Sequence, residues 1–373
     1  MPDFDVIIAG LGAMGSAAAY HLAKSSRRVL GLDRYQPPHQ MGSSHGSTRI
    51  IREAYFEDPA YVPLVQRAYQ LWSALEQESG HRLLVQTGGL MLGEPGGTLV
   101  RGAKRSAEEH QLPYRLLTFE EIRREFPMFQ PPSTAVAIWE PRAGILFPEL
   151  AIQAHLELAT RHGAHLRFNE QILDWQPLNH GVRVRSAVGT YTAKKLLLAA
   201  GSWTKSLVPD VALPLSVERQ VQFWFGPQSH PEIFQPKRCP IFICEYAPQR
   251  YFYGFPDLGD GVKAALHHQG SAVSPDLLDR EVKIHEIETI RSLLREHLPG
   301  AAGDLKSAVV CMYTNTPDEH FLFDRHPKYE QVLIASPCSG HGFKFSSVVG
   351  ELAAMLLCGG KTQFDLRLFK ISR

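Results

Sequence analysis

The sequence contains no long apolar run of the kind that crosses a membrane. A membrane-spanning helix needs about 18 consecutive apolar residues, and no stretch of the 373-residue chain reaches that length. The apolar stretch 6–19 follows Asp3 and Asp5 instead of the basic residues that begin a signal peptide. We therefore expect a soluble protein with no membrane partner, located in the cytoplasm.

Cysteine is scarce, and neither sign of charge is in excess. The five cysteines are Cys239, Cys244, Cys311, Cys338 and Cys358. They form no CxxC pair, and no His or Cys cluster has zinc-ligand spacing, so we expect neither a disulfide framework nor a metal site. Lys plus Arg number 39 and Asp plus Glu 38, a formal net charge of +1. This balance gives no reason to expect nucleic acid as a partner.

The length of 373 residues predicts about two to three domains, and the hydrophobic pattern predicts a mixed α/β protein. Strands expected at 4–9 and 28–32 flank a helix expected at 13–25. Further expected helices are 62–79, 148–162 and 346–357, and further expected strands are 182–184, 190–200, 216–224, 250–254, 262–266 and 331–335. The strands that alternate suit a sheet with one face buried and one facing a cavity. The order predicts a nucleotide-binding domain made of discontinuous segments and interrupted by a β-rich substrate domain.

The first strand and helix are joined by a glycine-rich turn with the pattern GxGxxG. Its glycines are Gly10, Gly12 and Gly15, which would permit the tight turn, the close approach of a pyrophosphate and the packing of helix on strand. Asp33 follows the last glycine by 33 − 15 = 18 residues, at the end of the second strand. A carboxylate there suits hydrogen bonds to ribose hydroxyls. The motif predicts dinucleotide binding but does not separate FAD from NAD.

Four groups of residues could carry chemistry, each with an ordinary structural alternative. Arg49 and Arg52 could hold a carboxylate, and would share a face on a helical turn but not on a strand; the alternative is a pair of surface arginines. Lys263 and His267 would lie on one face of a strand, with solvent as the alternative environment.

The segment 339–347 and Cys311 complete these candidates. Glycines in 339–347 precede the last helix, with Ser346 as a plausible N-cap, and the helix N-terminus could face a flavin. A capped helix after a glycine turn is the alternative. Cys311 could simply be a buried free cysteine.

In this order and spacing, the motifs resemble the monomeric sarcosine oxidase family, which includes N-methyltryptophan oxidase and belongs to the D-amino-acid-oxidase-like flavoproteins. The resemblance covers essentially the whole chain. Its most specific stretches are 42–52, 253–256, 311–313, 317–321 and 339–344. Ser44 and Ser47 depart from the family pattern, which has His and Asp at these places.

The resemblance implies a Rossmann-type FAD-binding domain and a second, β-rich (α+β) substrate domain. The FAD-binding domain is expected at 1–85, 146–212 and 318–373, and the substrate domain at 86–145 and 213–317. It also implies FAD attached covalently to Cys311. Arg34, His45, Thr48, Gly342 and Lys344 join the glycines and Asp33 as expected cofactor-binding residues.

The resemblance implies an oxidase that acts on a secondary amino acid, such as sarcosine, with O2 as the electron acceptor. The products would be the primary amino acid, formaldehyde and hydrogen peroxide. Arg52 and Lys344 would hold the substrate carboxylate. Arg49 would lie against the flavin, Lys263 would face the ring where O2 reacts, and Tyr253 and His267 would line the substrate cavity. The protein would act as a monomer.

Three alternatives remain open at this point. The enzyme could act on other amines such as N-methyltryptophan, proline or pipecolate, or pass electrons to an acceptor other than O2. It could be an NAD-linked dehydrogenase. It could also be a flavin-binding protein without catalytic activity.

Overall fold

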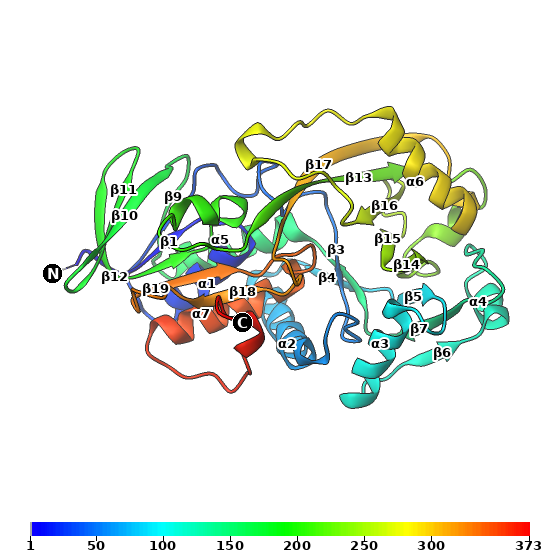
Figure 1. Cartoon of the computed structure of the whole chain (residues 1–373), viewed down its shortest axis with the longest axis horizontal. Helices are drawn as coiled ribbons and strands as arrows, with labels where there is room; N and C mark the ends of the chain where they lie inside the picture. The colour runs from blue at the N-terminus through cyan, green and yellow to red at the C-terminus, as the bar shows by residue number, and fades with distance from the viewer. Residues whose placement is uncertain (1) are drawn as a thin grey trace.

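The computed structural model describes residues 2–373 and shows an elongated molecule with a large sheet toward each end (Figure 1). The first sheet has the order β10-β11-β12-β1-β2-β9, and β19 pairs with β12 and β18. Its strands are β1 (Phe4–Ala9), β2 (Val29–Leu32), β9 (His165–Arg167), β10 (Ile172–Leu178), β11 (Gly181–Ser186), β12 (Thr190–Leu198), β18 (Leu322–Arg325) and β19 (Val332–Ser336). The chain therefore returns to this sheet from distant segments.

Strand β1 lies inside the first sheet, parallel to both β2 and β12. Its side chains alternate between two cores: Val6 and Ile8 join the core under the helices, and Ile7 and Ala9 join the core on the opposite face. A strand covered on both faces is expected to be apolar at every position, as this one nearly is. The helices packed around it are α1 (Ala13–Lys24), α2 (Val62–Ser79), α5 (Pro148–Arg161) and α7 (Ser346–Leu357).

The second sheet has the order β17-β13-β16-β15-β14-β5-β7-β6. Its strands are β5 (Gly89–Gly93), β6 (Arg115–Leu117), β7 (Val136–Glu140), β13 (Ser216–Phe225), β14 (Ile241–Ala247), β15 (Arg250–Phe255), β16 (Val262–His267) and β17 (Leu305–Asn315). Helices α3 (Thr98–Glu109), α4 (Phe119–Glu125) and α6 (Ile284–His297) accompany it. A small third sheet, β3 (Arg49–Ile51), β8 (Gly144–Leu146) and β4 (Leu84–Gln86), lies between the two large ones (Figure 1).

Side chains along the strands of the second sheet alternate between an apolar face, which is packed in a core, and a face that carries candidate site residues. Phe223, Phe252 and Ala264 share a core with residues of α6. The intervening positions point the other way, so that Lys263 on β16 reaches the backbone of the segment before β3. The predicted arrangement, with one face buried and the other directed at a cavity, is thus confirmed for these strands.

Most of the predicted elements are present, and the predicted fold class is confirmed. Helix α2 occupies the predicted residues, whereas α3, α4 and α6 were not predicted. The N-cap prediction for Ser346 is wrong: a 3₁₀ turn, Phe343–Phe345, runs directly into α7, and the Ser346 hydroxyl makes no capping hydrogen bond. The helix therefore begins as a continuation of this turn, without the side-chain cap that the sequence suggested.

A long segment, 268–283, leaves β16 and crosses toward the first sheet before α6 begins (Figure 1, yellow). Asp276 pairs with Arg34 at 2.6 Å, and Arg280 donates to the carbonyl of Gln40 at 2.9 Å.

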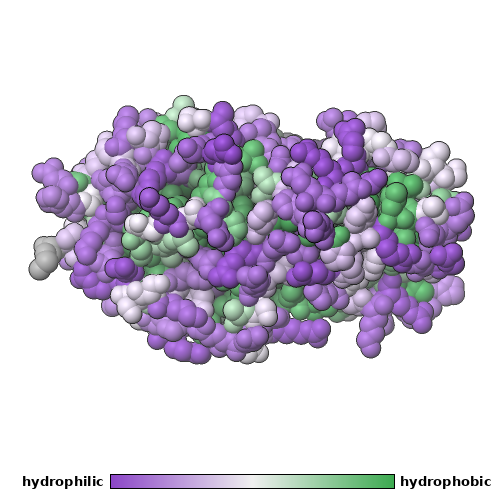
Figure 2. All heavy atoms as spheres, turned by 90° about the horizontal axis from the view of Figure 1, so that it is seen from below, coloured by the Kyte–Doolittle hydropathy of each residue, from purple (hydrophilic) through white to green (hydrophobic). Residues whose placement is uncertain are grey.

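Among residues 2–373, no helix combines the length and the apolar character that a membrane crossing requires. On the face shown in Figure 2, apolar residues appear as separated patches rather than as a continuous band.

Candidate active site

The glycine-rich turn forms the floor of a cavity at the carboxyl end of β1, called here the nucleotide cavity. Gly10 has φ +91°, and a Cβ on it would lie 2.6 Å from the carbonyl oxygen of Ala199. A Cβ on Gly15 would lie 1.8 Å from the carbonyl oxygen of Gly10, so helix and turn could not pack as they do. A Cβ on Gly12 would meet nothing within 4 Å, because this residue borders the open cavity. The three glycines therefore have the separate roles that the motif predicts.

Asp33 and Arg34 also border the nucleotide cavity, where the end of β2 meets the turn. Asp33 accepts hydrogen bonds from the backbone N–H groups of Leu11 at 2.7 Å and Tyr35 at 2.8 Å. Its carboxylate therefore fixes the turn and remains at the cavity wall. Backbone N–H groups at the start of α1 and a carboxylate at the end of β2 fit a dinucleotide whose ribose hydroxyls need an acceptor.

A second cavity, called here the inner cavity, continues from the first. Ala13, Met14, Ser43, Ser44 and Cys338 line both. Of the predicted site residues, those that line the inner cavity are Arg49, Arg52, Tyr253, His267, Gly342 and Lys344. The structure thus brings together residues that lie almost 300 positions apart in the sequence.

Arg49 and Arg52 both reach the inner cavity because β3 ends at Ile51, between them. The strict alternation of a strand therefore does not apply to Arg52. Arg49 donates to the backbone carbonyls of Thr48, Ser43 and His45, each at 2.7 Å. These three bonds fix the guanidinium group at the wall of the inner cavity.

Arg52 is buried, with 2% of its surface exposed, and is paired with a carboxylate that the sequence did not reveal. Its Nη2 lies 2.7 and 2.6 Å from the two carboxylate oxygens of Glu57, and its Nη1 donates to the carbonyl of Ala54 at 3.0 Å. Burial acts to raise the pKa of Glu57, but the effects of Arg52, His341 and Lys344 together outweigh it, and the pKa lies below its usual value. The pair is therefore an ion pair at neutral pH.

The turn that carries Arg52 is held by Glu140, at the end of β7. Its carboxyl group accepts from the backbone N–H groups of Glu53 at 2.6 Å and Ala54 at 2.9 Å. Burial raises the pKa of Glu140 to about 7, although these two donors act to lower it. Glu140, a residue of the second sheet, thereby helps to position Arg52, which follows β3 of the third sheet.

Lys344 is the second buried cation of the inner cavity. Its Nζ donates to the carbonyl of His341 at 2.7 Å and to the hydroxyl of Tyr55 at 3.3 Å. Burial, with the charge of Arg52, lowers the pKa of Lys344 to about 7. An incoming carboxylate would stabilise the ammonium form, because it would place a further negative charge beside the lysine.

Lys263 lies against Phe255, which lines the inner cavity, with its Nζ 4.9 Å from the ring centroid. The same Nζ donates to the carbonyl of Gly46 at 2.6 Å, and to the carbonyl and hydroxyl of Thr48 at 3.1 and 3.0 Å. Burial and the charge of Arg49 lower the pKa of Lys263 well below its usual value. Three oxygen acceptors nevertheless match the three N–H groups of an ammonium ion.

Tyr253 and His267 come from neighbouring strands, β15 and β16, which are paired so that Tyr253 lies opposite Ala265. The Tyr253 and His267 rings are 6.3 Å apart, and the His267 ring is 5.8 Å from that of Tyr313. Burial and the neighbouring His268 lower the pKa of His267 well below its usual value, so the imidazole is neutral. These rings line the same cavity as the buried cations and add no charge to it.

Cys311 is buried on β17, beside the inner cavity. Gln222, which lines that cavity, donates from Nε2 to Cys311 Sγ at 3.2 Å. His45 borders a third cavity and is 3% exposed; neither of its ring nitrogens has a hydrogen-bond partner among the described residues. Thr48 binds Lys263 instead of lining either of the first two cavities.

Sequence reasoning missed Tyr55, Glu57, Gln222, Tyr313 and His341, which contribute to the inner cavity or bind its cations. Tyr313 and His341 fall inside stretches that carry the family resemblance, so their positions could have indicated them. Glu57 gave no such signal. Within residues 2–373, no group of His, Cys, Asp and Glu is arranged to hold a metal ion.

The structure thus joins a cavity that fits a dinucleotide to a second cavity lined by two buried basic side chains, an arrangement that suits an oxidoreductase. The chain matches the family model described as FAD dependent oxidoreductase over residues 5–356. It belongs to this family and, within it, to the group that contains monomeric sarcosine oxidase and N-methyl-L-tryptophan oxidase. It is therefore an FAD-dependent oxidoreductase.

The similarity to curated relatives extends over the full length of the chain. It is 44% identical to the monomeric sarcosine oxidase of Streptomyces avermitilis, over 99% of this chain and 97% of the relative. It is 35% identical to the N-methyl-L-tryptophan oxidase of Yersinia pestis, over 100% of this chain and 99% of the relative. Among solved structures, NikD, an unusual amino acid oxidase, shares the fold with a TM-score of 0.87 at 24% identity, over 98% of this chain and 97% of that one.

Proposed function

We propose that the protein oxidises a secondary amino acid, such as sarcosine or another N-methyl amino acid, and uses O2 as the electron acceptor. The observation that carries the proposal is the presence of two buried cations, Arg52 and Lys344, in a cavity continuous with the nucleotide cavity. Buried charges need partners. Arg52 has Glu57, whereas the hydrogen-bond acceptors of Lys344 are a carbonyl and a hydroxyl, so a substrate carboxylate is a suitable additional ligand.

The cavity suits an amine as well as a carboxylate. When bound, FAD would supply the two-electron redox chemistry between the amine and O2. Removal of hydride from carbon needs the free lone pair of the neighbouring nitrogen, and nearby cations favour the neutral amine because they lower its pKa. The neutral ring of His267 adds no further positive charge and can hydrogen-bond to the amine. Tyr253 and His267 would orient the substrate, and the carboxylate contacts would hold it.

Cys311 is the residue to which we assign covalent attachment of FAD. Its support is the family match and its position beside Gln222 at the wall of the inner cavity. Cys338 is the other cysteine near the cofactor, since it lines both cavities. Burial raises the pKa of Cys338 to about 11, which makes its thiolate scarce at neutral pH.

Product analysis in air tests the oxidase assignment. Sarcosine should give glycine, formaldehyde and hydrogen peroxide in equal amounts, with one O2 consumed for each. Arg52→Ala should raise the apparent Kd for sarcosine by at least about tenfold, because loss of one partner of a buried charge pair typically costs about 2–5 kcal/mol. Arg67→Ala, which removes a partly exposed arginine paired with Glu351, is the matched control and should change the Kd little.

Failure of sarcosine to yield peroxide would not by itself exclude a larger substrate. The same assay should therefore include an N-methyl hydrophobic amino acid, proline and pipecolate. Oxidation of substrate with an artificial electron acceptor but not with O2 would identify a dehydrogenase and contradict the proposal.

A further inference from the structure

Tyr55 contacts both of the cations that the proposed function assigns to the substrate carboxylate. Its ring centroid lies 4.2 Å from the guanidinium carbon of Arg52 and 5.1 Å from Nζ of Lys344. The residue is completely buried. Two positive groups in a dry cavity repel each other, and the face of an aromatic ring attracts both. One side chain thus connects a residue that follows β3 with a residue of the 3₁₀ turn that precedes α7.

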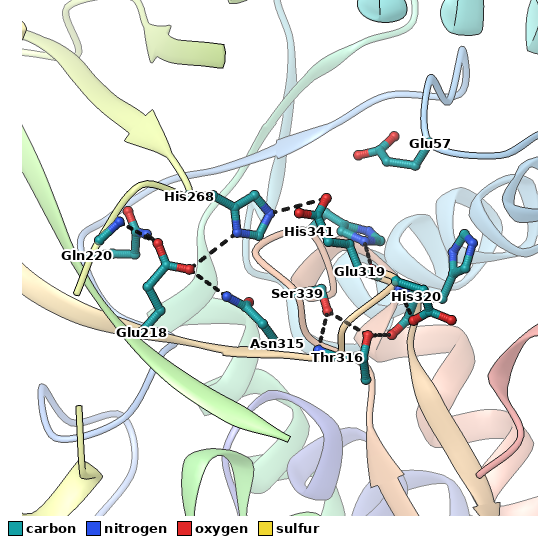
Figure 3. Close-up of polar contacts among 12 residues, drawn as sticks. Glu57, Glu218, Gln220, His268, Asn315, Thr316, Glu319, His320, Ser339 and His341 are labelled. Carbon is teal, nitrogen blue, oxygen red and sulfur yellow. Dashed lines mark hydrogen bonds and ion pairs between the residues drawn. The ribbon is translucent and has the colours of Figure 1, made fainter. Parts of the chain in front are cut away.

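Lys344, Tyr55, His341 and the backbone carbonyl of Glu319 form a series of hydrogen bonds. The direction of each bond follows from the carbonyl at the end of this series. The carbonyl of Glu319 can only accept, so His341 donates to it from Nε2, at 2.9 Å (Figure 3). Burial lowers the pKa of His341 to about 3, so the ring is neutral and Nδ1 carries a lone pair. Tyr55 therefore donates its hydroxyl proton to His341 Nδ1, at 2.5 Å.

The same series leaves the Tyr55 oxygen as an acceptor for Lys344. Nζ of Lys344 lies 3.3 Å from this oxygen and donates to it. Burial raises the pKa of Tyr55 well above its usual value, so the residue remains a phenol rather than a second anion beside Glu57. The hydroxyl is therefore oriented by His341, and its lone pair is directed to the lysine.

We propose that Tyr55 is a positioning residue that holds Arg52 and Lys344 together as one carboxylate-binding site, through its ring face for both cations and its hydroxyl oxygen for Lys344. This inference rests on the proposed function, because it explains how the assigned pair is maintained before the substrate arrives. Tyr55 contacts the cations and does not itself line the inner cavity.

The protonation state of Lys344 gives a readout that a purely structural role would not change. The charged and titratable groups that act on Lys344 are Arg52, Tyr55, Glu57, His267 and His341. With the pKa of Lys344 at about 7, carboxylate binding at higher pH requires the uptake of a proton. The affinity should then fall about tenfold for each pH unit above the midpoint.

The experiment measures acetate binding to the FAD-loaded protein by isothermal titration calorimetry between about pH 5.5 and 9. Acetate has no amine, so the measured affinity reports the carboxylate site alone. In Tyr55→Phe the ring remains but Lys344 loses an acceptor, and the midpoint should move at least about half a pH unit lower. The low-pH affinity should stay within about threefold of wild type, whereas Tyr55→Leu, which also removes the ring, should lose about tenfold.

Tyr61→Phe is the matched control. The Tyr61 ring packs against that of Tyr55, with centroids 4.8 Å apart. Its hydroxyl bonds to His320 at 3.1 Å and takes no part in the series of hydrogen bonds that includes Lys344. This variant should keep the wild-type midpoint. If Tyr55→Phe cannot be isolated with FAD bound, His341→Leu decides the question, because it removes the acceptor that orients the Tyr55 hydroxyl and should move the midpoint in the same direction.

The outcomes separate this inference from the proposed function. An unchanged midpoint in Tyr55→Phe, or an equal loss of affinity at every pH, overturns the role of Tyr55. Lys344→Met should abolish the pH dependence above neutrality. If Lys344→Met binds acetate with the wild-type affinity and pH profile, the carboxylate site itself is misassigned.

Discussion

The carboxylate of Glu57 binds the guanidinium group of Arg52, with Nη2 2.6 and 2.7 Å from its two oxygens. The protein thus places one of its own carboxylates on the cation to which we assign the substrate carboxylate. Both partners are largely shielded from water, with side-chain exposures of 2% and 11%. Substrate binding must therefore either displace Glu57 or add a second anion beside it.

Glu57→Gln tests this relationship. Removal of the internal carboxylate should tighten acetate binding by roughly tenfold, because acetate becomes the only anion available to Arg52. Without ligand, the variant should have a lower Tm than wild type, since it leaves a buried charge without its partner. Acetate should restore much of that Tm. Weaker acetate binding in Glu57→Gln would mean that Glu57 supports the ligand site instead of competing for it.

Cys311→Ser tests the assigned covalent attachment of FAD. Acid-precipitated wild-type protein should remain yellow, and the Cys311→Ser pellet should be colourless because nothing links the flavin to the chain. Cys338→Ser is the control, since Cys338 lines both cavities. Its pellet should remain yellow. A colourless Cys338→Ser pellet together with a yellow Cys311→Ser pellet would move the link to Cys338.

Lys263→Met tests whether the buried lysine serves the reaction with O2. The variant keeps an unbranched apolar stem and removes the charge. A fixed ammonium group stabilises the negative charge that develops on O2 as it accepts an electron. Stopped-flow measurements should show reoxidation slowed by at least about a hundredfold, or about 2.7 kcal/mol, with anaerobic reduction by substrate changed only modestly. Lys306→Met, on the exposed part of β17, should leave both steps unchanged.

The opposite result for Lys263→Met would change its assignment. Slow reduction with normal reoxidation would make Lys263 a residue of the amine-oxidation step. The bonds from Nζ to Gly46 and Thr48 would then serve to orient the lysine toward substrate.

Glu140 predicts a pH dependence of stability. Its pKa in the folded protein, about 7, lies above the usual carboxyl value of 4.5. The folded state therefore binds more protons than the unfolded state between these values, and the contribution of Glu140 to stability is lost as pH rises through about 7. The Tm of wild type, compared with that of Glu140→Gln, should fall as pH increases from about 4.5 to 7. Parallel Tm profiles for the two proteins would contradict the raised pKa.

The sequence predicts the scaffold better than it predicts the contacts within the site. Strand β1, the glycine turn and Asp33 follow from local pattern, because each has a role that a few neighbouring residues determine. Arg49 and Arg52 could not be placed by periodicity, since their positions depend on where β3 ends. The Arg52–Glu57 pair and the Tyr55–His341 bond depend on tertiary folding, and no spacing rule encodes them.

Anaerobic reduction of the bound flavin tests the central claim most directly. The purified protein should be mixed without O2 with sarcosine, an N-methyl hydrophobic amino acid, proline, pipecolate and dimethylamine, and its visible absorbance followed. We expect at least one of the secondary amino acids to bleach the flavin rapidly, and dimethylamine, which lacks a carboxylate for Arg52 and Lys344, to react at least about a hundredfold more slowly. Equal reduction by dimethylamine, or no reduction by any of the amino acids, would contradict the account.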